Sequence, residues 1–333
     1  MQRKLLLRLL AVLCLFAPKD AFARRPSAPE RIASRYEWLE PRYPDVRIVI
    51  DRPERMRKNR PTKVLFYALP NGNTIEWTAG KKMEAGDDWH YDIQHIAAQT
   101  RFLRKKMKRC NIVTVYLMAE GKSWTAWRTL HAQDKAQVLP AIVDEVLDMF
   151  SAYRPKAVLS GHSGGGYFLF EYIRAVERIP DSVERLAFLD STYGYQDSLH
   201  AEKLTEWIAR RKDHRLCVIS YQDATVVIDG KHIVSASGGT WGRSFAMAAD
   251  LARCFSLRSS QTDDFIDINH AQGRIFFKLK KNPDGHIYHT VLVERNGFID
   301  TVLEGTSKAG RGYRFWGERA YSRYLDQSPI VLP

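Results

Sequence analysis

The sequence predicts a single α/β domain in which a mostly parallel β-sheet carries helices on both faces. Short apolar or β-branched runs alternate with segments of helical periodicity from residue 45 onward. The run at 112–118 is almost continuously apolar, as expected for a strand that is buried on both faces. No linker rich in Pro, Gly and Ser divides the chain, so we expect one domain over residues 45–333.

The expected elements follow these two patterns along the chain. In the helix expected at 138–150, for example, Ile142, Val143 and Val146 recur on one face. Strands are expected at 46–50, 64–69, 112–118, 157–159, 186–189, 216–220 and 274–279. Helices are expected at 89–107, 138–150, 167–176, 199–210, 244–254 and from 297 to 303.

Composition and charge restrict the classes of partner. The 333 residues are 45% hydrophobic and 27% charged, which is typical of a globular protein with a sizeable core. A formal net charge of +13 makes anionic partners relevant, but no nucleic-acid-binding module is recognisable, so we expect no nucleic acid partner. The basic clusters at 52–63 and 101–109 are expected to be solvated faces, and they also suit electrostatic association with an anionic cell-envelope surface.

The first residues have the pattern of a signal peptide. Basic residues precede a short apolar run at 9–17, and an Ala-x-Ala cleavage pattern ends at Ala23. The run is shorter than the ~20 residues that a membrane span needs, so no transmembrane segment is expected. We therefore expect export to the periplasm or outside the cell, with residues 1–23 removed and an irregular lead-in at 24–44.

Cysteine and histidine spacing favours neither a disulfide scaffold nor a metal site. Cys110, Cys217 and Cys254 remain after the expected cleavage, so one disulfide would leave one thiol unpaired, and the pairing stays open. His286 and His289 are three residues apart but have no carboxylate ligand near them in the sequence. We expect no metal and no organic cofactor.

A Gly-His-Ser-Gly-Gly-Gly motif at 161–166 lies between an expected strand and an expected helix. The G-x-S-x-G pattern at such a junction needs a tight, strained turn, which lifts the Ser163 hydroxyl above the sheet near a helix N-terminus. This placement predicts a nucleophile. The alternative is that Ser163 only caps the helix. His162 is expected to point elsewhere and to shape the turn.

On this motif, and on its place in the chain, the sequence resembles the α/β-hydrolase superfamily over most of residues 45–310. Within it, the chain resembles an exported bacterial serine-hydrolase-like group with an H-S-G-G elbow. The Asp-Ser-Thr-Tyr-Gly turn at 190–194 and the Gly-Gly-Thr at 238–240 also match that group. The resemblance implies the α/β-hydrolase fold and a Ser-His-acid triad, in the chain order Ser, acid, His.

The resemblance also places the base and the acid. His289 is favoured as the base because it follows the strand at 274–279 and is nearer the final helix than His286. Asp190, at the end of one strand, is favoured as the acid over Asp223, which follows the next strand. The segment after Asp223 is expected to form a hairpin that carries it away. Either aspartate could instead cap a turn.

The oxyanion hole is expected to use backbone amides. One amide belongs to Gly164, and the other to the loop at 70–74, where Gly72 allows close approach and Asn71 or Asn73 adds a side-chain donor. A plain Asn-Gly turn is the alternative. This loop departs from the His-Gly-Gly-Gly form of lipases, which argues against a lipase.

These observations together predict an exported serine hydrolase that cleaves an ester, or an amide, of a small-molecule or envelope-derived acyl substrate. The alternatives are a non-catalytic binding protein on the same fold and an acyltransferase. Aromatic residues near the same sheet edge are expected either to line an acyl or sugar pocket or to pack beneath a cap segment. They are Trp77, Trp89, His90, Trp124 and Trp127.

Overall fold

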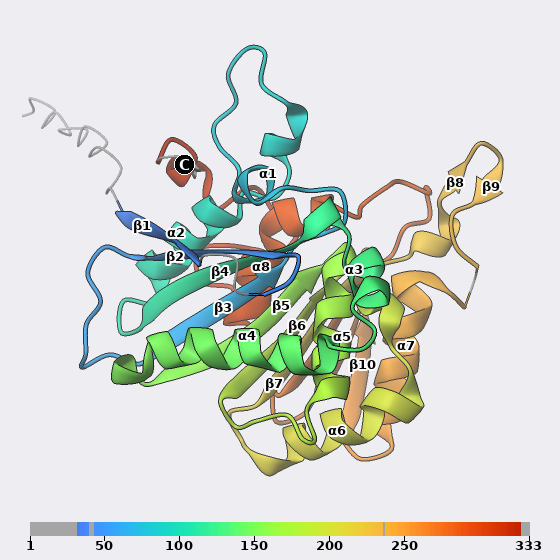
Figure 1. Cartoon of the computed structure of the whole chain (residues 1–333). Helices are drawn as coiled ribbons and strands as arrows, with labels where there is room; N and C mark the ends of the chain where they lie inside the picture. Colours follow the sequence, from blue (N-terminus) through green and yellow to red (C-terminus); the bar gives the residue numbers. More distant parts are fainter. Residues whose placement is uncertain (1–31, 40–42, 236, 328–333) are drawn as a thin grey trace, which may run out of the picture. The chain divides into compact units, whose positions relative to one another are not determined.

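A ten-stranded sheet forms the centre of the computed structural model, which describes residues 32–39, 43–235 and 237–327 as parts of one compact unit (Figure 1). The predicted signal peptide at 1–23 lies outside the described residues. In spatial order the strands are β1 (Ser34–Leu39), β2 (Val46–Pro53), β4 (Asn111–Ala119), β3 (Thr62–Ala68), β5 (Pro155–His162), β6 (Val183–Leu189), β7 (Arg215–Tyr221), β12 (Ile275–Lys280), β11 (Phe265–His270) and β10 (Leu257–Gln261).

The sheet is parallel in its centre and antiparallel at both edges. The neighbours from β4 to β12 run parallel, which confirms the predicted mostly parallel sheet. β1 and β2 at one edge, and β11 and β10 at the other, pair antiparallel. β1 corrects the expectation of an irregular segment over 24–44. Tyr36 and Trp38 alternate with Arg35 and Glu37 along this strand and pack against the core layer under α2 and α8. This alternation is too short to identify a strand beside the Arg- and Pro-rich residues before it.

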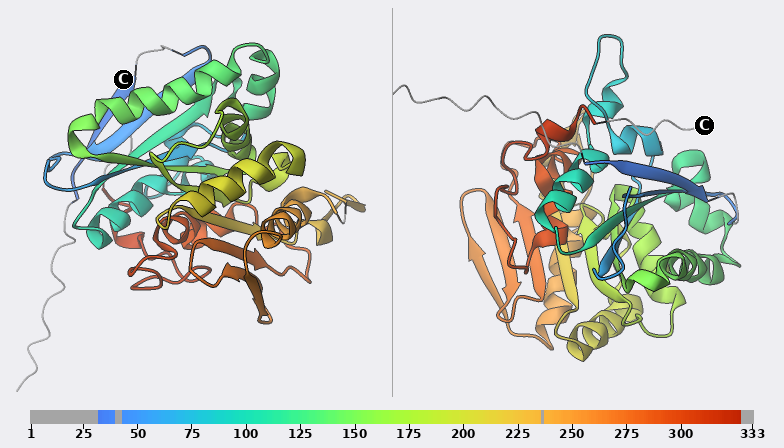
Figure 2. Two further views of the ribbon diagram at one scale, coloured as in Figure 1. Left: turned by 90° about the horizontal axis from the view of Figure 1, so that it is seen from below. Right: turned by 90° about the vertical axis from the view of Figure 1, so that its left-hand side faces the viewer.

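Helices cover both faces of this sheet (Figure 2). Helices α3 to α7 pack on one face, and α1, α2 and α8 pack on the other. In the described part of the chain, no helix has the length and apolar character needed to span a membrane. The bounds are α1 (Ile75–Ala79), α2 (Ile96–Lys106), α3 (Trp124–Leu130), α4 (Lys135–Met149), α5 (Gly166–Ala175), α6 (Asp197–Arg210), α7 (Gly239–Ala252) and α8 (Phe298–Leu303).

Alternation along the central strands divides the core into two layers. On β3, Val64 and Phe66 face the layer under α4 and α5, whereas Leu65 and Tyr67 face the layer under α2 and α8. All of β4 is buried, as its sequence predicted. The helix–sheet–helix layering therefore follows from the two apolar faces of each central strand.

The predicted helix at 89–107 is two elements. A short 3₁₀ turn, η1 (Trp89–Asp92), is separated from α2 by His95, whose φ of +50° lies in the left-handed region. This break turns the chain before α2 begins. The apolar spacing alone could not locate it, because the buried His95 carries no Gly or Pro signal.

The basic cluster at 101–109 is only partly a solvated face. The Arg104 guanidinium pairs with the fully buried Asp51 carboxylate at 2.8 Å and donates to the Ile112 carbonyl at 3.0 Å. Burying both charges is tolerated because each has polar partners. Arg104 therefore ties α2 to β2 and β4 instead of facing solvent.

Three cysteines lie in the described part of the chain, and each is a free thiol. Cys217 is buried, Cys110 is half-buried and Cys254 is exposed. Burial raises the pKa of the Cys217 thiol to about 12, so this group stays protonated and unreactive at neutral pH.

Candidate active site

The G-x-S-x-G motif forms a sharp turn between β5 and α5. The strand ends at His162, a single turn of 3₁₀ helix, η4 (Ser163–Gly165), follows, and α5 begins at Gly166. Ser163 has a φ of +52°, in the left-handed region that non-glycine residues rarely occupy. Its side chain is half-buried, and its hydroxyl has no hydrogen-bond partner among the described residues. The turn thus holds an unengaged hydroxyl at the carboxyl edge of the sheet.

Glycines beside Ser163 let three elements meet there. A Cβ on Gly165 would lie well inside 3.0 Å of the Ala68 carbonyl oxygen at the end of β3. A Cβ on Gly166 would do the same to the Ser191 carbonyl oxygen after β6. Real Cβ atoms do not approach so closely, so only glycine allows α5 to start against the ends of both strands.

His289 and Asp190 form a hydrogen-bonded pair beside this turn. His289 lies in the loop between β12 and η7 (Val293–Gly297), and its Nδ1 contacts Asp190 Oδ2. Asp190 follows β6, is 0% exposed and has a φ of +44°, and its amide donates to the Ile219 carbonyl at 2.7 Å. The His289 side chain is 25% exposed, so the imidazole is accessible from solvent. Of the two predicted acids, Asp190 is the one that contacts His289.

His162 lies against His289 and does not point away from the site as the sequence suggested. The two rings are 4.6 Å apart between centroids, and His162 Nε2 donates to the His289 carbonyl oxygen at 2.9 Å. Burial and the neighbouring His289 hold the pKa of His162 well below its usual range, so its ring stays neutral. A residue beside the expected nucleophile thus fixes the backbone of His289.

Asp223 also stays close to Asp190. It follows β7 in a short turn, η6 (Asp223–Thr225), and the hairpin predicted after it is present as β8 (Val227–Ile228) and β9 (Lys231–His232). The hairpin does not carry Asp223 away. The residue is 1% exposed, and its Oδ2 accepts a hydrogen bond from the Thr240 amide at 2.7 Å. Burial, and then the charge of Asp190, raise the pKa of Asp223 to about 6.

Thr240 is a site residue whose contacts the sequence did not predict. Its hydroxyl donates to Asp190 Oδ1 and lies 3.3 Å from Asp223 Oδ2. Its carbonyl accepts from the Thr192 hydroxyl at 2.9 Å, so the Asp-Ser-Thr-Tyr-Gly and Gly-Gly-Thr motifs meet here. The signal was therefore present as a motif, but only the fold brings the two motifs together.

His286, the alternative base, is exposed. Asn282 holds its backbone, accepting from the His286 amide at 3.0 Å and donating to its carbonyl at 2.8 Å. His270 lies on β11, away from the loop that carries His289. Neither histidine contacts Asp190 or Asp223 among the described residues.

Gly164 and Asn71, two of the residues predicted to form an oxyanion hole, lie together, but the amide of the third, Gly72, is not free to donate. A Cβ on Gly164 would collide with the Asn71 side chain, so the two residues are in close contact. The Gly72 amide donates to the Lys122 carbonyl at 2.8 Å. Gly72 therefore does not offer the free donor that the sequence predicted, because a neighbouring turn uses that amide.

The Asn71 side chain is also engaged. Its Oδ1 accepts from the Trp124 amide at 3.1 Å, and its Nδ2 donates to the Thr125 hydroxyl at 3.3 Å. The backbone amide of Asn71, in contrast, has no hydrogen-bond partner among the described residues. As the second residue of a helical start, Gly164 has an amide without an i−4 partner. The amides of Gly164 and Asn71 therefore both remain available as donors among the described residues.

The aromatic residues divide into two groups. Trp124 and Trp127 are buried, and the Trp124 ring packs 5.2 Å from Phe168, so these two are core residues. Trp77, His90 and Trp89 instead form a stacked column with ring separations of 4.3 and 3.8 Å. They pack on one another, which agrees with the packing alternative and not with an acyl or sugar pocket.

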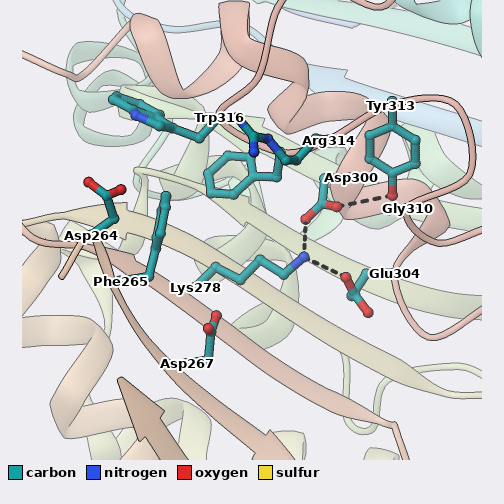
Figure 3. Close-up of a pocket in the computed structure, with 11 residues that line it drawn as sticks. Asp264, Phe265, Asp267, Lys278, Asp300, Glu304, Gly310, Tyr313, Arg314 and Trp316 are labelled. Carbon is teal, nitrogen blue, oxygen red and sulfur yellow. Dashed lines mark hydrogen bonds and ion pairs between the residues drawn. The ribbon is translucent and has the colours of Figure 1, made fainter. Parts of the chain in front are cut away.

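A cavity of about 540 Å³ lies elsewhere, between β11, β12 and α8, and none of Ser163, Asp190 and His289 lines it (Figure 3). Lys278 reaches across it, 2.7 Å from Asp300 and in contact with Glu304. The site described above and this cavity are therefore separate features.

Comparisons with known proteins give matches among solved structures only. No family model matches this chain, and no curated protein matches its sequence. A thermostable esterase is 14% identical with a TM-score of 0.47, over 81% of this chain and 63% of that chain, so this chain spans less than two thirds of it. A feruloyl esterase module from Clostridium thermocellum is 11% identical with a TM-score of 0.45, over 91% of each chain.

A predicted CIB-like hydrolase from Thermoplasma acidophilum is 12% identical with a TM-score of 0.41, over 81% of this chain and 97% of that chain. The chain's own topology carries the assignment of its fold. Parallel strands lead to a strained serine turn between β5 and α5, and a histidine follows the last parallel strand, β12. By this order of elements, the chain has the α/β-hydrolase fold, as its sequence predicted.

Proposed function

We propose that this protein is a serine hydrolase that cleaves a carboxylic ester with Ser163 as nucleophile, His289 as general base and Asp190 as the acid. The contact between His289 Nδ1 and the buried Asp190 carboxylate, beside the strained turn at Ser163, is the observation that carries the proposal. A serine of this kind is a weak nucleophile until a base takes its proton. The pair supplies such a base.

In the proposed reaction the Ser163 hydroxyl attacks the ester carbonyl while His289 Nε2 accepts its proton. Asp190 holds Nδ1–H, which leaves Nε2 free to accept, and stabilises the imidazolium that forms. The negative oxygen of the tetrahedral intermediate accepts from the amides of Gly164 and Asn71. His289 then protonates the leaving alkoxide, and the acyl group remains on Ser163.

Water completes the cycle in the second half of the reaction. His289 removes a proton from water, the hydroxide attacks the acyl carbonyl, and the proton returns to Ser163 as the carboxylic acid leaves. The imidazole is 25% exposed, so bulk water reaches this position directly. This exposure favours hydrolysis over transfer to another acceptor. The acyl group belongs to a small-molecule or envelope-derived substrate.

A fluorophosphonate probe tests the nucleophile. Such a probe reacts with an activated serine, so it should label the wild type and not Ser163→Ala. Ser151→Ala is the matched control, because Ser151 is an exposed serine in another turn and its loss should leave labelling intact. Absence of labelling in folded wild-type protein would support a non-catalytic binding protein instead. Hydrolysis of p-nitrophenyl esters of increasing acyl length then defines the substrate range.

The proposal includes export, for which residues 1–23 are the support. The purified native protein should then begin at or near Arg24, which intact mass measures. Exposed basic residues such as Arg55 and Lys58 would meet anionic envelope polymers, so co-sedimentation with an envelope fraction should weaken as salt rises. A full-length cytosolic protein would contradict this part of the proposal and leave the chemistry at Ser163 untouched.

A further inference from the structure

Two buried carboxyl groups meet at a single hydroxyl behind His289. Thr240, which is 0% exposed, donates its hydroxyl proton to Asp190 Oδ1 and lies 3.3 Å from Asp223 Oδ2. Asp190 and Asp223 are themselves almost wholly buried. A hydroxyl has one proton to donate and two lone pairs that accept, so Thr240 can link two carboxyl groups only when one of them carries a proton.

The hydrogen bonds around the two acids differ in a way that shows which one is suited to carry that proton. Asp190 has a partner on each oxygen, namely His289 on Oδ2 and Thr240 on Oδ1. Asp223 Oδ1 is buried and has no partner among the described residues. Unpartnered buried carboxylate oxygens are costly when charged. The bonds can therefore run from Asp223 through Thr240 to Asp190, all donating toward the carboxylate that holds His289.

We propose that Thr240 and Asp223 are positioning residues of the active site. Thr240 fixes the Asp190 carboxylate against His289, and Asp223 holds Thr240 and, once it has lost its proton, supplies a second carboxyl charge behind Asp190. The inference rests on the proposed function of Ser163. It adds two residues that do not touch the substrate but determine how firmly His289 is oriented.

Helix capping is the competing explanation for Asp223. Its Oδ2 accepts from the Thr240 amide in the first turn of α7, as a capping carboxylate does. Gly239, with a φ of +62°, brings the helix start so close that a Cβ there would collide with the Asp223 carboxylate. Asn caps helices as well as Asp does, so Asp223→Asn keeps the cap and removes only the ionisable charge.

The groups that face Asp223 are acidic or neutral. Asp190 approaches from β6, Tyr221 from β7 and Tyr193 from the turn η5 (Thr192–Gly194). Burial and the two carboxyls raise the pKa of both tyrosines, so these rings stay protonated. No Lys or Arg pairs with Asp223 in the described part of the chain. Once Asp223 is ionised, its charge therefore acts on the Asp190–His289 pair with no Lys or Arg counter-ion beside it among the described residues.

Variants at Thr240 isolate the hydroxyl. Thr240→Ala and Thr240→Ser both lose the methyl group, but only the serine keeps the hydroxyl. We expect Thr240→Ala to lower kcat roughly 10- to 100-fold with KM within about twofold, because it removes a hydrogen bond to a charged group. Thr240→Ser should stay within about threefold of the wild type. Equal activity of the two variants would reduce Thr240 to a structural role and overturn the proposal.

The pH profile isolates the charge of Asp223. We expect Asp223→Asn to keep kcat within about tenfold, but to move the acidic limb of the kcat/KM profile to lower pH by roughly half a unit, since a nearby negative charge favours the protonated imidazole. A profile that coincides with the wild type would leave Asp223 as a cap only. If Thr240→Ala does not fold, Thr240→Val, which keeps the shape without the hydroxyl, replaces it. Activity in Ser163→Ala would instead refute the proposed function itself.

Discussion

Two pairs of carboxyl groups lie at least partly out of solvent, and the molecule stabilises them by different means. Asp300 and Glu304 on and after α8 share the Lys278 ammonium, which reaches between them from β12 (Figure 3). Among the described residues, Asp190 and Asp223, near the ends of β6 and β7, share the Thr240 hydroxyl, and the His289 imidazole contacts Asp190 alone. One pair is neutralised by a fixed cation, and the other is not.

We interpret this difference as one between a structural ion network and the catalytic site that we propose. Both oxygens of Asp300 have partners, Lys278 at 2.7 Å and the Tyr313 hydroxyl at 3.0 Å, and the two carboxylates raise the pKa of Lys278. A lysine so held cannot give up its proton at neutral pH. At the other pair the cation would be His289 itself, once it has taken a proton from Ser163. Excess carboxyl charge without a fixed counter-ion is what a developing imidazolium needs.

The largest expected effect is on activity at the second pair. We expect Asp190→Asn to lower kcat by about 10³- to 10⁴-fold, because an amide cannot stabilise the imidazolium and favours the wrong tautomer. Steady-state hydrolysis of a p-nitrophenyl ester measures this loss. Asp223→Asn is the comparison variant, with a loss of roughly tenfold or less. A larger loss for Asp223→Asn would make Asp223 the acid and leave Ser163 and His289 in place.

Breaking the ion pairs of Lys278 with Asp300 and Glu304 should lower stability and leave activity unchanged. Lys278→Met leaves the buried Asp300 and the half-buried Glu304 without their cation, and removal of one partner of a buried ion pair costs about 3 to 5 kcal/mol of unfolding free energy. Urea denaturation measures the loss, and kcat per folded molecule should be unchanged. Lys231→Met on the exposed hairpin strand β9 is the matched control and should cost little. A loss of activity in folded Lys278→Met would contradict the separation of the two sites.

The sequence predicts the central strands and the serine turn better than it predicts the edge strands. Continuous apolar runs located the central strands, and the turn at Ser163 was evident from its glycines and its neighbours in the chain. The edge strands β1, β10 and β11 were not predicted. Most of β10 is exposed, and in β1 and β11 only two or three apolar side chains alternate with polar ones. Such short patterns do not distinguish a strand from a loop until a neighbouring strand pairs with them.

The supporting contacts of the site also depend on distant segments. The sequence predicted Asp190 and His289 as a pair, and the structure brings the two into contact. It also predicted that a hairpin carries Asp223 away. That hairpin exists, and Asp223 nevertheless stays buried because the Thr240 amide and hydroxyl, 17 residues later, bind its carboxylate. The amide of Gly72 is similarly taken by Lys122, which no motif in the loop indicates. Contacts of this kind follow from tertiary packing alone.

An effect of intermediate size is expected in the pH dependence of the unfolding free energy, to which Asp223 contributes. The pKa of Asp223 is raised from 3.8 to about 6, so between about pH 4 and pH 6 the folded protein keeps a proton that the unfolded chain has lost. The contribution of Asp223 to the unfolding free energy therefore falls as pH rises through this window, by about 2 to 3 kcal/mol. Asp223→Asn cannot ionise and should lack this loss.

Urea denaturation of the wild type and Asp223→Asn at several pH values from 4 to 8 measures this effect as a difference. Other titrating groups cancel between the two proteins. The variant should gain about 2 to 3 kcal/mol relative to the wild type between pH 4 and pH 7. Parallel curves would mean that Asp223 ionises as freely in the folded protein as in the unfolded one, and the contrast between the two carboxyl pairs would disappear.

The smallest expected effect is a loss of stability on removing the Tyr313 hydroxyl, which donates to Asp300 in the first carboxyl pair. Tyr313→Phe removes the hydrogen bond to Asp300 Oδ1 but keeps the ring, which packs edge-on 6.1 Å from Phe102. Since Lys278 still neutralises Asp300, we expect a loss of only about 1 kcal/mol of unfolding free energy and no change in kcat. Tyr153→Phe, at a half-buried tyrosine whose hydroxyl has no partner among the described residues, is the control and should change neither quantity. The Thr240 and Tyr313 hydroxyls each donate one hydrogen bond to a buried aspartate. If Thr240→Ala and Tyr313→Phe lose similar stability but only Thr240→Ala loses kcat, the difference between the two carboxyl pairs is due to the imidazole that only Asp190 holds.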